Sequence, residues 1–181
     1  MSKLKNNSLV IFTIDFPYGN GEPFLFNEIN ILSGKFKTIF IFPMNFLDQE
    51  SKYKLPENVE VVKFNIFQPY NRVKILIKNL RFISSIYLAE FFYNKSKTKY
   101  LGQFFYTFNN LTHKIAVADN LYNFLKQKEI NNAVSYTYWF NQWTLVLSII
   151  NAKHEHLNIY TRIHGMDVYE EQHSKENFFF Q

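Results

Sequence analysis

The chain has no cysteine, and only five glycines and five prolines among its 181 residues. The absence of cysteine excludes disulfides, a thiolate nucleophile and a cysteine-ligated metal, and it fits a reducing compartment. Few backbone breakers together with 21 Phe and 12 Tyr argue against disorder and against a small-stranded β-sandwich. We therefore expect one domain, residues 1–181, with an aromatic core.

Several functional motifs are also missing. Residues 1–7 are short and polar and lack the apolar core of a signal peptide, so we expect a cytoplasmic protein. The sequence has no G-x-S-x-G nucleophile elbow and no G-x-x-x-x-G-K-S/T phosphate loop. His154 and His156 alternate without further ligands nearby, so no zinc site is expected.

The net charge of +5 is concentrated in one part of the chain. Between residues 69 and 106 there are seven basic residues and one acidic residue, within a strongly apolar segment. The charges interrupt the segment too early for a membrane-spanning helix. A helix that carries Arg72, Lys74, Lys78 and Arg81 beside a broad apolar face could lie on an anionic membrane. The pattern alone slightly favours a helix packed on a sheet with solvated lysines, and no motif indicates nucleic-acid binding.

Strand-like and helix-like segments alternate along the chain. Apolar runs predict strands at 8–14, 38–43, 59–63, 133–137 and 157–163. Helical spacing predicts helices at 22–32, 70–95, 103–128 and 142–151. This alternation predicts a Rossmann-like α/β fold, an open parallel sheet with helices on both faces.

A glycine-bearing segment, Phe-Pro-Tyr-Gly-Asn-Gly-Glu-Pro-Phe, follows the first strand. Gly19 and Gly21 flank Asn20 just before a helix that begins near Glu22. Glycine permits a positive φ and a close backbone approach, and the N–H groups at a helix start favour an anion such as phosphate. The G-x-G spacing alone is also found in ordinary strand-to-helix turns, which are the commoner explanation.

A second segment, Arg-Ile-His-Gly-Met-Asp, ends the last strand. His164 could bind a sugar hydroxyl, act as a base, or only satisfy a local hydrogen bond. Asp167 is expected first as a helix N-cap. Arg162 pairs either with a phosphate or with Glu170 or Glu171. Because ligands bind beyond the carboxyl ends of parallel strands, both segments could face one pocket.

A third segment, Tyr-Thr-Tyr-Trp-Phe-Asn-Gln-Trp, follows the fourth strand. Its aromatic rings and amides, among them Tyr138, Trp139 and Asn141, could form a platform for sugars. An aromatic core at a strand–helix junction explains the same pattern equally well.

Taken in order, the three segments resemble the N-terminal domain of family 4 retaining glycosyltransferases, the group-1-type enzymes of bacterial polysaccharide assembly. The resemblance spans about residues 8–175 and depends on the order of the segments. It implies the GT-B architecture, in which two Rossmann-like domains face each other across a cleft. The N-terminal domain mainly binds the acceptor, and the C-terminal domain binds the nucleotide-sugar donor. Such hexosyltransferases usually need no metal or other cofactor.

The resemblance also implies roles for individual residues on the donor side. The loop of Gly19, Asn20 and Gly21 would approach the donor phosphates, with Glu22 beginning the helix behind it. His164 would be the catalytic residue that contacts the transferred sugar.

On the acceptor side, Tyr138, Trp139, Asn141 and Arg162 would bind the glycan. The resemblance also implies that Gly165, next to His164, allows a close approach to the sugar, and that Asp167 orders the loop. The acceptors of the family are often lipid-linked, which favours contact of the basic helix with the inner face of the plasma membrane.

The 181 residues contain no counterpart of the donor domain. We therefore expect a truncated, N-terminal fragment that is inactive alone, with the donor half supplied by a longer chain or by a separate partner chain. The alternative is a non-catalytic Rossmann-like module that binds a glycan or a membrane.

Overall fold

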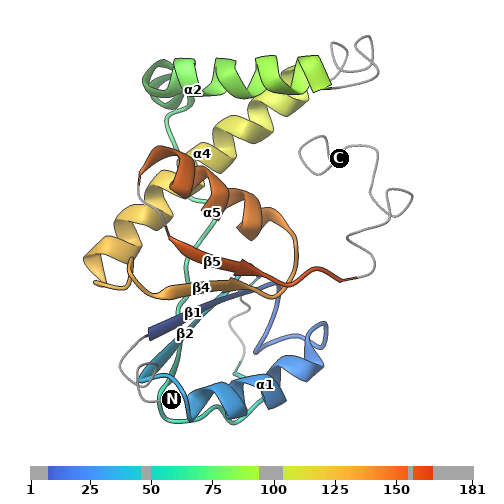
Figure 1. Cartoon of the computed structure of the whole chain (residues 1–181), viewed down its shortest axis with the longest axis vertical. Helices are drawn as coiled ribbons and strands as arrows, with labels where there is room; N and C mark the ends of the chain where they lie inside the picture. Colours follow the sequence, from blue (N-terminus) through green and yellow to red (C-terminus); the bar gives the residue numbers. More distant parts are fainter. Residues whose placement is uncertain (1–7, 46–49, 94–103, 155–156, 165–181) are drawn as a thin grey trace.

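The computed structural model describes residues 8–45, 50–93, 104–154 and 157–164. In this part of the chain, five parallel strands form one sheet in the order β3-β2-β1-β4-β5. Helices cover both faces of the sheet (Figure 1). The protein therefore has a Rossmann-like α/β fold, which confirms the fold predicted from the sequence.

The predicted elements are present with small changes of boundary. The strands are β1 (Ser8–Thr13), β2 (Thr38–Pro43), β3 (Val59–Val61), β4 (Val134–Thr137) and β5 (Asn158–Thr161). The helices are α1 (Pro23–Ser33), α2 (Arg72–Tyr93), α4 (Phe104–Gln127) and α5 (Gln142–Lys153). The strands β3 and β5 are shorter than their apolar runs, and α5 ends two residues later than predicted.

The central strand β1 pairs with β2 on one side and with β4 on the other. Its side chains alternate between two cores: Leu9 and Ile11 pack on the α1 side, and Val10 and Phe12 on the side of α4 and α5. A strand buried on both faces needs a continuous apolar run, which is the pattern that β1 has.

The core on the side of α4 and α5 is aromatic, as the composition predicts. The ring of Phe12 lies 5.2 Å from the ring of Phe42 and 5.0 Å from that of Trp143. Phe124 of α4 meets the edge of Phe42 at 5.9 Å. The indole N–H of Trp143 donates to the Thr13 carbonyl at 3.0 Å, so this ring is fixed at the end of β1.

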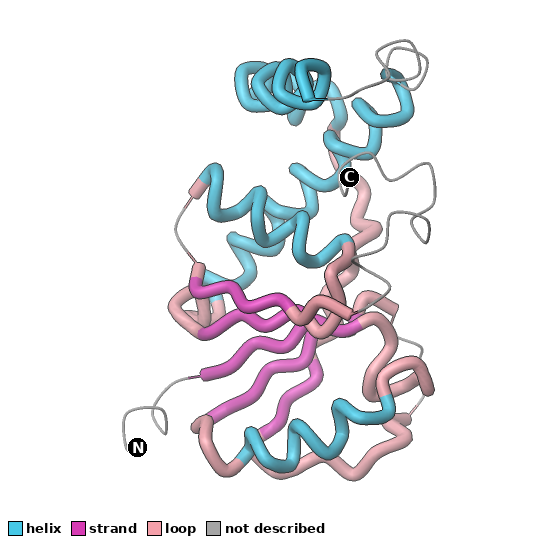
Figure 2. The backbone as a smooth tube through the Cα atoms, turned by 45° about the vertical axis from the view of Figure 1, so that its right-hand side comes forward, coloured by secondary structure: helices cyan, strands magenta, loops and turns pink. Residues whose placement is uncertain are grey.

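Helix α2 is placed differently from the expectation. Instead of packing on the sheet, it packs on α4, beyond the layer that covers the sheet (Figures 1 and 2). It bends at Asn79, where φ is −117° and ψ is 17°, and the Asn79 amide donates to the Ile75 carbonyl at 2.8 Å. Among the described residues, no helix is long and apolar enough to cross a membrane.

The loops that follow the strands gather at one side of the sheet (Figure 2). The strand order reverses between β1 and β4, because β1 continues to β2 on one side and β4 to β5 on the other. In open parallel sheets this switch point is where ligands bind. The three segments singled out in the sequence all leave the sheet at this edge.

Candidate functional site

The loop after β1 is closed by a carboxylate of the chain itself. Glu22 is buried, and its carboxylate accepts the backbone N–H groups of Ile14 at 3.0 Å, Asp15 at 3.1 Å and Phe16 at 2.9 Å. Burial raises the pKa of Glu22 above its ordinary value, although these three hydrogen bonds lower it. The backbone N–H groups at this strand end are therefore already occupied by an anionic group.

The two glycines of this loop serve close packing, not an unusual backbone conformation. A Cβ at Gly19 would lie 1.7 Å from Oδ2 of Asp15, and one at Gly21 would lie 3.3 Å from Oδ1. The Asp15 carboxylate thus occupies the space beside both glycines. No glycine in the described part of the chain has a positive φ, so the loop does not use that freedom. Asn20 is exposed and accepts a hydrogen bond from Lys52 Nζ at 3.0 Å.

The electrostatics of the loop bear on its predicted contact with donor phosphates. Asp15 and Glu22 place two carboxyl groups in it, and the Asp15 carboxylate adds to the raised pKa of Glu22. Since like charges repel, a phosphate gains nothing from these groups. The donor-phosphate role of residues 19–22 stays a prediction.

The end of β4 and the end of β5 meet in an aromatic cluster. The buried Tyr138 is held by its backbone N–H, which donates to the Phe12 carbonyl at 3.0 Å. Nε2 of His164 lies 3.0 Å from the Tyr138 carbonyl. The imidazole ring lies 4.0 Å from the ring of Trp139 at an angle of 31°. The structure thus brings together two segments that the sequence separates by more than twenty residues; we call Tyr138, Trp139, Arg162 and His164 the aromatic cluster.

Trp139 has an unused hydrogen-bond donor. Its side chain is partly exposed, but Nε1 is buried and has no partner in the described structure. A buried N–H without an acceptor costs free energy, so such groups are uncommon in folded proteins.

Arg162 is positioned from three sides. Its backbone N–H donates to the Thr137 carbonyl at 3.0 Å, and its guanidinium lies 4.8 Å from the centre of the Tyr138 ring. The guanidinium donates to Glu28 of α1 at 2.8 Å. Glu28 is a partner that the sequence did not predict; the predicted partners Glu170 and Glu171 lie outside the described residues.

Beside this ion pair, an open groove of about 440 Å³ runs between α1 and β5. Tyr136, Tyr160 and Arg162 line it on the strand side, and Leu32 and Phe36 on the helix side. Burial raises the pKa of the Tyr136 hydroxyl, and the negative charge of Glu28 raises it further. Tyr136 therefore stays a neutral hydrogen-bonding group at this position.

Asn141 has a structural role that the sequence analysis missed. Its side chain accepts the backbone N–H of Trp143 at 2.9 Å and caps the start of α5. The signal was present, since Asn directly before a helix is a preferred N-cap. Two other predicted site residues, Gly165 and Asp167, lie outside the described residues.

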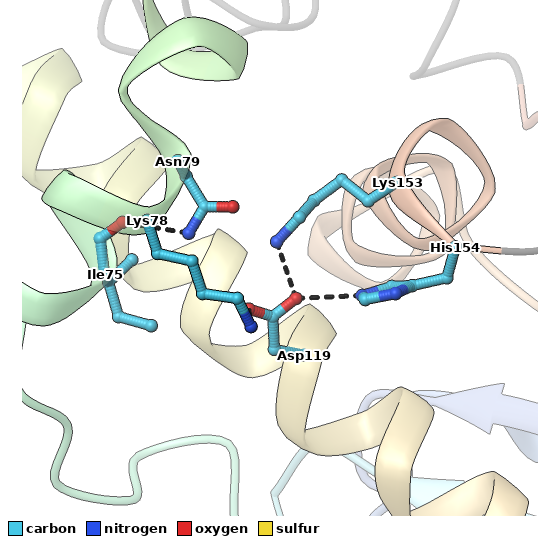
Figure 3. A network of polar contacts seen from close by, with 6 residues as sticks. All are labelled: Ile75, Lys78, Asn79, Asp119, Lys153 and His154. Carbon is cyan, nitrogen blue, oxygen red and sulfur yellow. Dashed lines mark hydrogen bonds and ion pairs between the residues drawn. The ribbon is translucent and has the colours of Figure 1, made fainter.

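Two buried charged groups were also missed. Lys114 of α4 is 6% exposed, and its ammonium donates to the Gln142 side chain at the start of α5. Burial lowers the pKa of this ammonium to about 8. Asp119, also on α4, accepts Lys153 Nζ at 2.6 Å and lies 2.9 Å from Nε2 of His154 (Figure 3).

The basic residues predicted to contact a membrane are all on α2 and all exposed: Arg72, Lys74, Lys78 and Arg81. They are thus on a different element from the aromatic cluster. In the described residues no group of three or more His, Asp or Glu side chains could hold a metal ion.

Comparison with protein-family models, with curated proteins and with solved structures finds no match to this chain. The fold and the site alone define the class: a Rossmann-like α/β domain with an aromatic cluster, containing His and Arg, at the carboxyl edge of its sheet.

Proposed function

We propose that this chain is the acceptor-side domain of a retaining glycosyltransferase with GT-B architecture. The enzyme would move a sugar from a nucleotide-sugar donor to a growing, lipid-linked glycan in polysaccharide biosynthesis. The observation that supports this proposal is the contact between Trp139 and His164 at the carboxyl ends of β4 and β5, with Arg162 beside them.

The chemistry of the aromatic cluster suits a sugar. A pyranose ring has an apolar face that packs on an indole ring, and hydroxyls at its edge that need hydrogen-bond partners. Trp139 supplies a partly exposed ring on which that face can pack. Arg162 supplies further donors, and its ion pair with Glu28 holds it in place.

His164 is the residue we assign to the transferred sugar. Because a carbonyl oxygen only accepts hydrogen bonds, the Nε2 atom facing the Tyr138 carbonyl carries the proton. This bond and the ring contact with Trp139 fix the plane of the imidazole. A fixed ring loses little freedom when it binds a sugar hydroxyl, which favours transfer.

In the GT-B fold the donor is bound by the second domain, so we propose that this chain binds the acceptor and needs a donor domain for turnover. The charge that develops on the leaving diphosphate would be met by protein hydrogen-bond donors and not by a metal. Turnover of a nucleotide sugar by the 181-residue chain alone would contradict this division of roles.

The chain offers a direct test of glycan binding, because it contains only two tryptophans. Trp143 is 1% exposed in the core, whereas Trp139 lies in the aromatic cluster. We expect titration with short hexose oligosaccharides to change the tryptophan fluorescence, and Trp139→Phe to abolish that change. In calorimetry, Trp139→Ala should weaken binding about tenfold, which corresponds to about 1.4 kcal/mol.

Phe67→Ala is the matched control, because Phe67 is an exposed aromatic residue after β3, at the opposite edge of the sheet from the aromatic cluster. An equal loss of affinity in both variants, or no loss for Trp139→Ala, would argue against the proposed site. His164→Ala should lower the rate of transfer strongly in an assembly that includes a donor domain.

A non-catalytic binding module is the second candidate. The observation that favours it is the loop after β1, whose carboxylates offer nothing to a donor phosphate. This candidate predicts the same glycan binding, but no transfer in the presence of any donor domain.

A further inference from the structure

Lys114 of α4 is a buried cation without an anionic partner. The residue is 6% exposed, and in the described structure its ammonium has one hydrogen bond, to the Gln142 side chain at the start of α5. No ion pair of Lys114 is present among the described residues. Burial of a charge without a counter-ion costs free energy, and an ammonium has three N–H groups to satisfy. The fold therefore leaves the charge of Lys114 uncompensated.

A small cavity adjoins this ammonium. Its polar lining residues are His113, Lys114 and Gln142, and no Asp or Glu side chain of the described residues lines it. The apolar lining residues are Met44, Ile66, Val117, Trp143 and Val146. The cavity of about 10 Å³ is at the lower limit for one water-sized group. One oxygen atom of an anion therefore fits beside Lys114, while the rest of the anion stays outside.

Lys114 is the charged member of this lining. Nε2 of His113 lies 3.2 Å from the Ile66 carbonyl, so this nitrogen carries the proton. Burial lowers the pKa of His113, and the neighbouring charge of Lys114 lowers it further, so the imidazole is neutral at pH 7. Burial also lowers the pKa of Lys114, to about 8, which leaves its ammonium charged at that pH. The cavity thus presents a net positive charge.

The cavity lies at the carboxyl edge of the sheet. Met44 directly follows β2, Ile66 follows β3, and Gln142 follows β4 as the first residue of α5. Helices α4 and α5, which carry Lys114 and Gln142, lie side by side on one face of the sheet (Figure 1). Because ligands of open parallel sheets bind at this edge, a ligand there can reach the cavity.

The first turn of α5 adds to the attraction for an anion. The N–H groups at the start of a helix carry partial positive charge, and this turn contains no acidic residue. The N-cap of α5 is Asn141, whose neutral side chain accepts the N–H of Trp143 and brings no negative charge. The charge of Lys114 and the start of α5 therefore act on the same place.

We propose that Lys114 and the start of α5 bind a phosphate group. One phosphate oxygen would enter the cavity and accept a hydrogen bond from the Lys114 ammonium, a common phosphate-binding group. Since Oε1 of Gln142 accepts this ammonium, its amide nitrogen is left to donate to a second oxygen. The site includes none of residues 19–22 and no member of the aromatic cluster, so the inference goes beyond glycan binding.

The test is thermal unfolding of the 181-residue chain at increasing concentrations of inorganic phosphate, with chloride keeping the ionic strength constant. A ligand that binds the folded state raises Tm with its concentration. We expect Lys114→Met, which keeps the length of the side chain and should fold, to bind phosphate about tenfold or more weakly. The general effect of phosphate on stability is the same for all variants, so differences between them report on the site.

Gln142→Glu is a second variant, which leaves Lys114 in place. At this exposed position a carboxylate would pair with the ammonium and would lie in the first turn of α5, where negative charge is favourable. We expect this variant to be more stable without phosphate and to lose the response to phosphate. Lys126→Met is the matched control, because Lys126 is an exposed lysine of α4 that does not line the cavity. It should respond to phosphate like the unchanged chain.

A hexose 1-phosphate distinguishes the two sources of a phosphate group. If it binds more tightly than inorganic phosphate and Lys114→Met removes this binding, the ligand is a phosphorylated sugar; equal binding of the two probes assigns the site to free phosphate. The proposal is overturned if neither probe binds, or if Lys126→Met loses as much affinity as Lys114→Met. Lys114→Met should keep the fluorescence response to uncharged oligosaccharides, so failure of the phosphate site is distinguishable from failure of the glycan site.

Discussion

Lys114 is a buried charged residue whose burial opposes folding. Its ammonium is buried between α4 and α5, and burial lowers its pKa to about 8. The charged form is therefore less favourable in the folded than in the unfolded chain, where the pKa is near 10.5. At pH 7 this difference opposes folding.

Replacement of Lys114 by methionine should stabilise the protein. We expect Lys114→Met to raise the free energy of unfolding by about 1–3 kcal/mol at pH 7, since the buried charge is removed and the side chain keeps its length. In the unchanged chain, the unfolded state binds more protons between about pH 8 and pH 10.5, so stability should rise with pH in that window. Urea unfolding of both proteins between pH 7 and pH 10.5 measures the stabilisation of the variant and the pH dependence of the unchanged chain. If the stability of Lys114→Met also rises between pH 8 and pH 10.5, another group causes the rise.

Gly19 is required by the packing of its own loop. A Cβ at this position would lie 1.7 Å from Oδ2 and 2.7 Å from Cβ of Asp15, so rotation of the carboxylate alone does not relieve the overlap. We expect Gly19→Ala to lower the free energy of unfolding by roughly 1–3 kcal/mol. Gly34→Ala is the control: its nearest neighbour would be 3.6 Å away and its φ is −76°, so that variant should be neutral or slightly stabilised. Thermal unfolding of both variants compares them directly.

At the scale of elements, Asp119 joins three helices. From α4 it accepts Lys153 Nζ and contacts His154, the first at the end of α5 and the second directly after it, and it faces Lys78 of α2 (Figure 3). Burial raises the pKa of Asp119, but the hydrogen bonds from Lys153 and His154 outweigh this and leave it lowered. The ionised form is thus favoured in the folded protein.

Asp119→Asn should loosen this junction. We expect a loss of about 2 kcal/mol in the free energy of unfolding at pH 7, because Lys153 loses its anionic partner. For the unchanged chain the contribution is complete above the unfolded pKa and disappears as pH falls through the lowered folded pKa. The difference between the two proteins in urea unfolding should therefore shrink toward acidic pH. A difference that stays constant down to pH 2 would exclude the carboxylate charge as its cause.

The sequence predicted the type and the order of the helices and strands, but not which of them pack against each other. The continuous apolar run of β1 could only be a strand buried on both faces, and the three-and-four spacing around Leu111, Ile115 and Leu121 required a buried helical face. For α2, both sides of the helix are apolar, so the pattern does not say which side is covered. That choice depends on α4, which is distant in the sequence.

The same reasoning applies to the site. His164 and Trp139 were singled out because they follow strands, and parallel strands bring such residues to one edge. Glu28 was not singled out, because nothing local marks this partly buried glutamate of α1 as the partner of an arginine 134 positions away. Asn141 had a clear capping signal, but its place among aromatic residues drew attention to sugar binding instead.

At the scale of the whole molecule, the aromatic cluster is connected to the helix layer on one face of the sheet. Arg162, which follows β5, donates to Glu28 of α1 at 2.8 Å while its guanidinium lies 4.8 Å from the centre of the Tyr138 ring. The position of Arg162 in the cluster therefore depends on α1 as well as on the strands.

This dependence makes a final prediction. Glu28→Gln should weaken the binding of short oligosaccharides about twofold to fivefold, because the guanidinium of Arg162 loses its anionic partner and is held less firmly. Glu60→Gln is the control, since Glu60 is exposed on β3 at the opposite edge of the sheet, and it should bind like the unchanged chain. Calorimetry measures the three affinities. Equal affinities of Glu28→Gln and the unchanged chain would mean that the ion pair does not position Arg162 for the ligand.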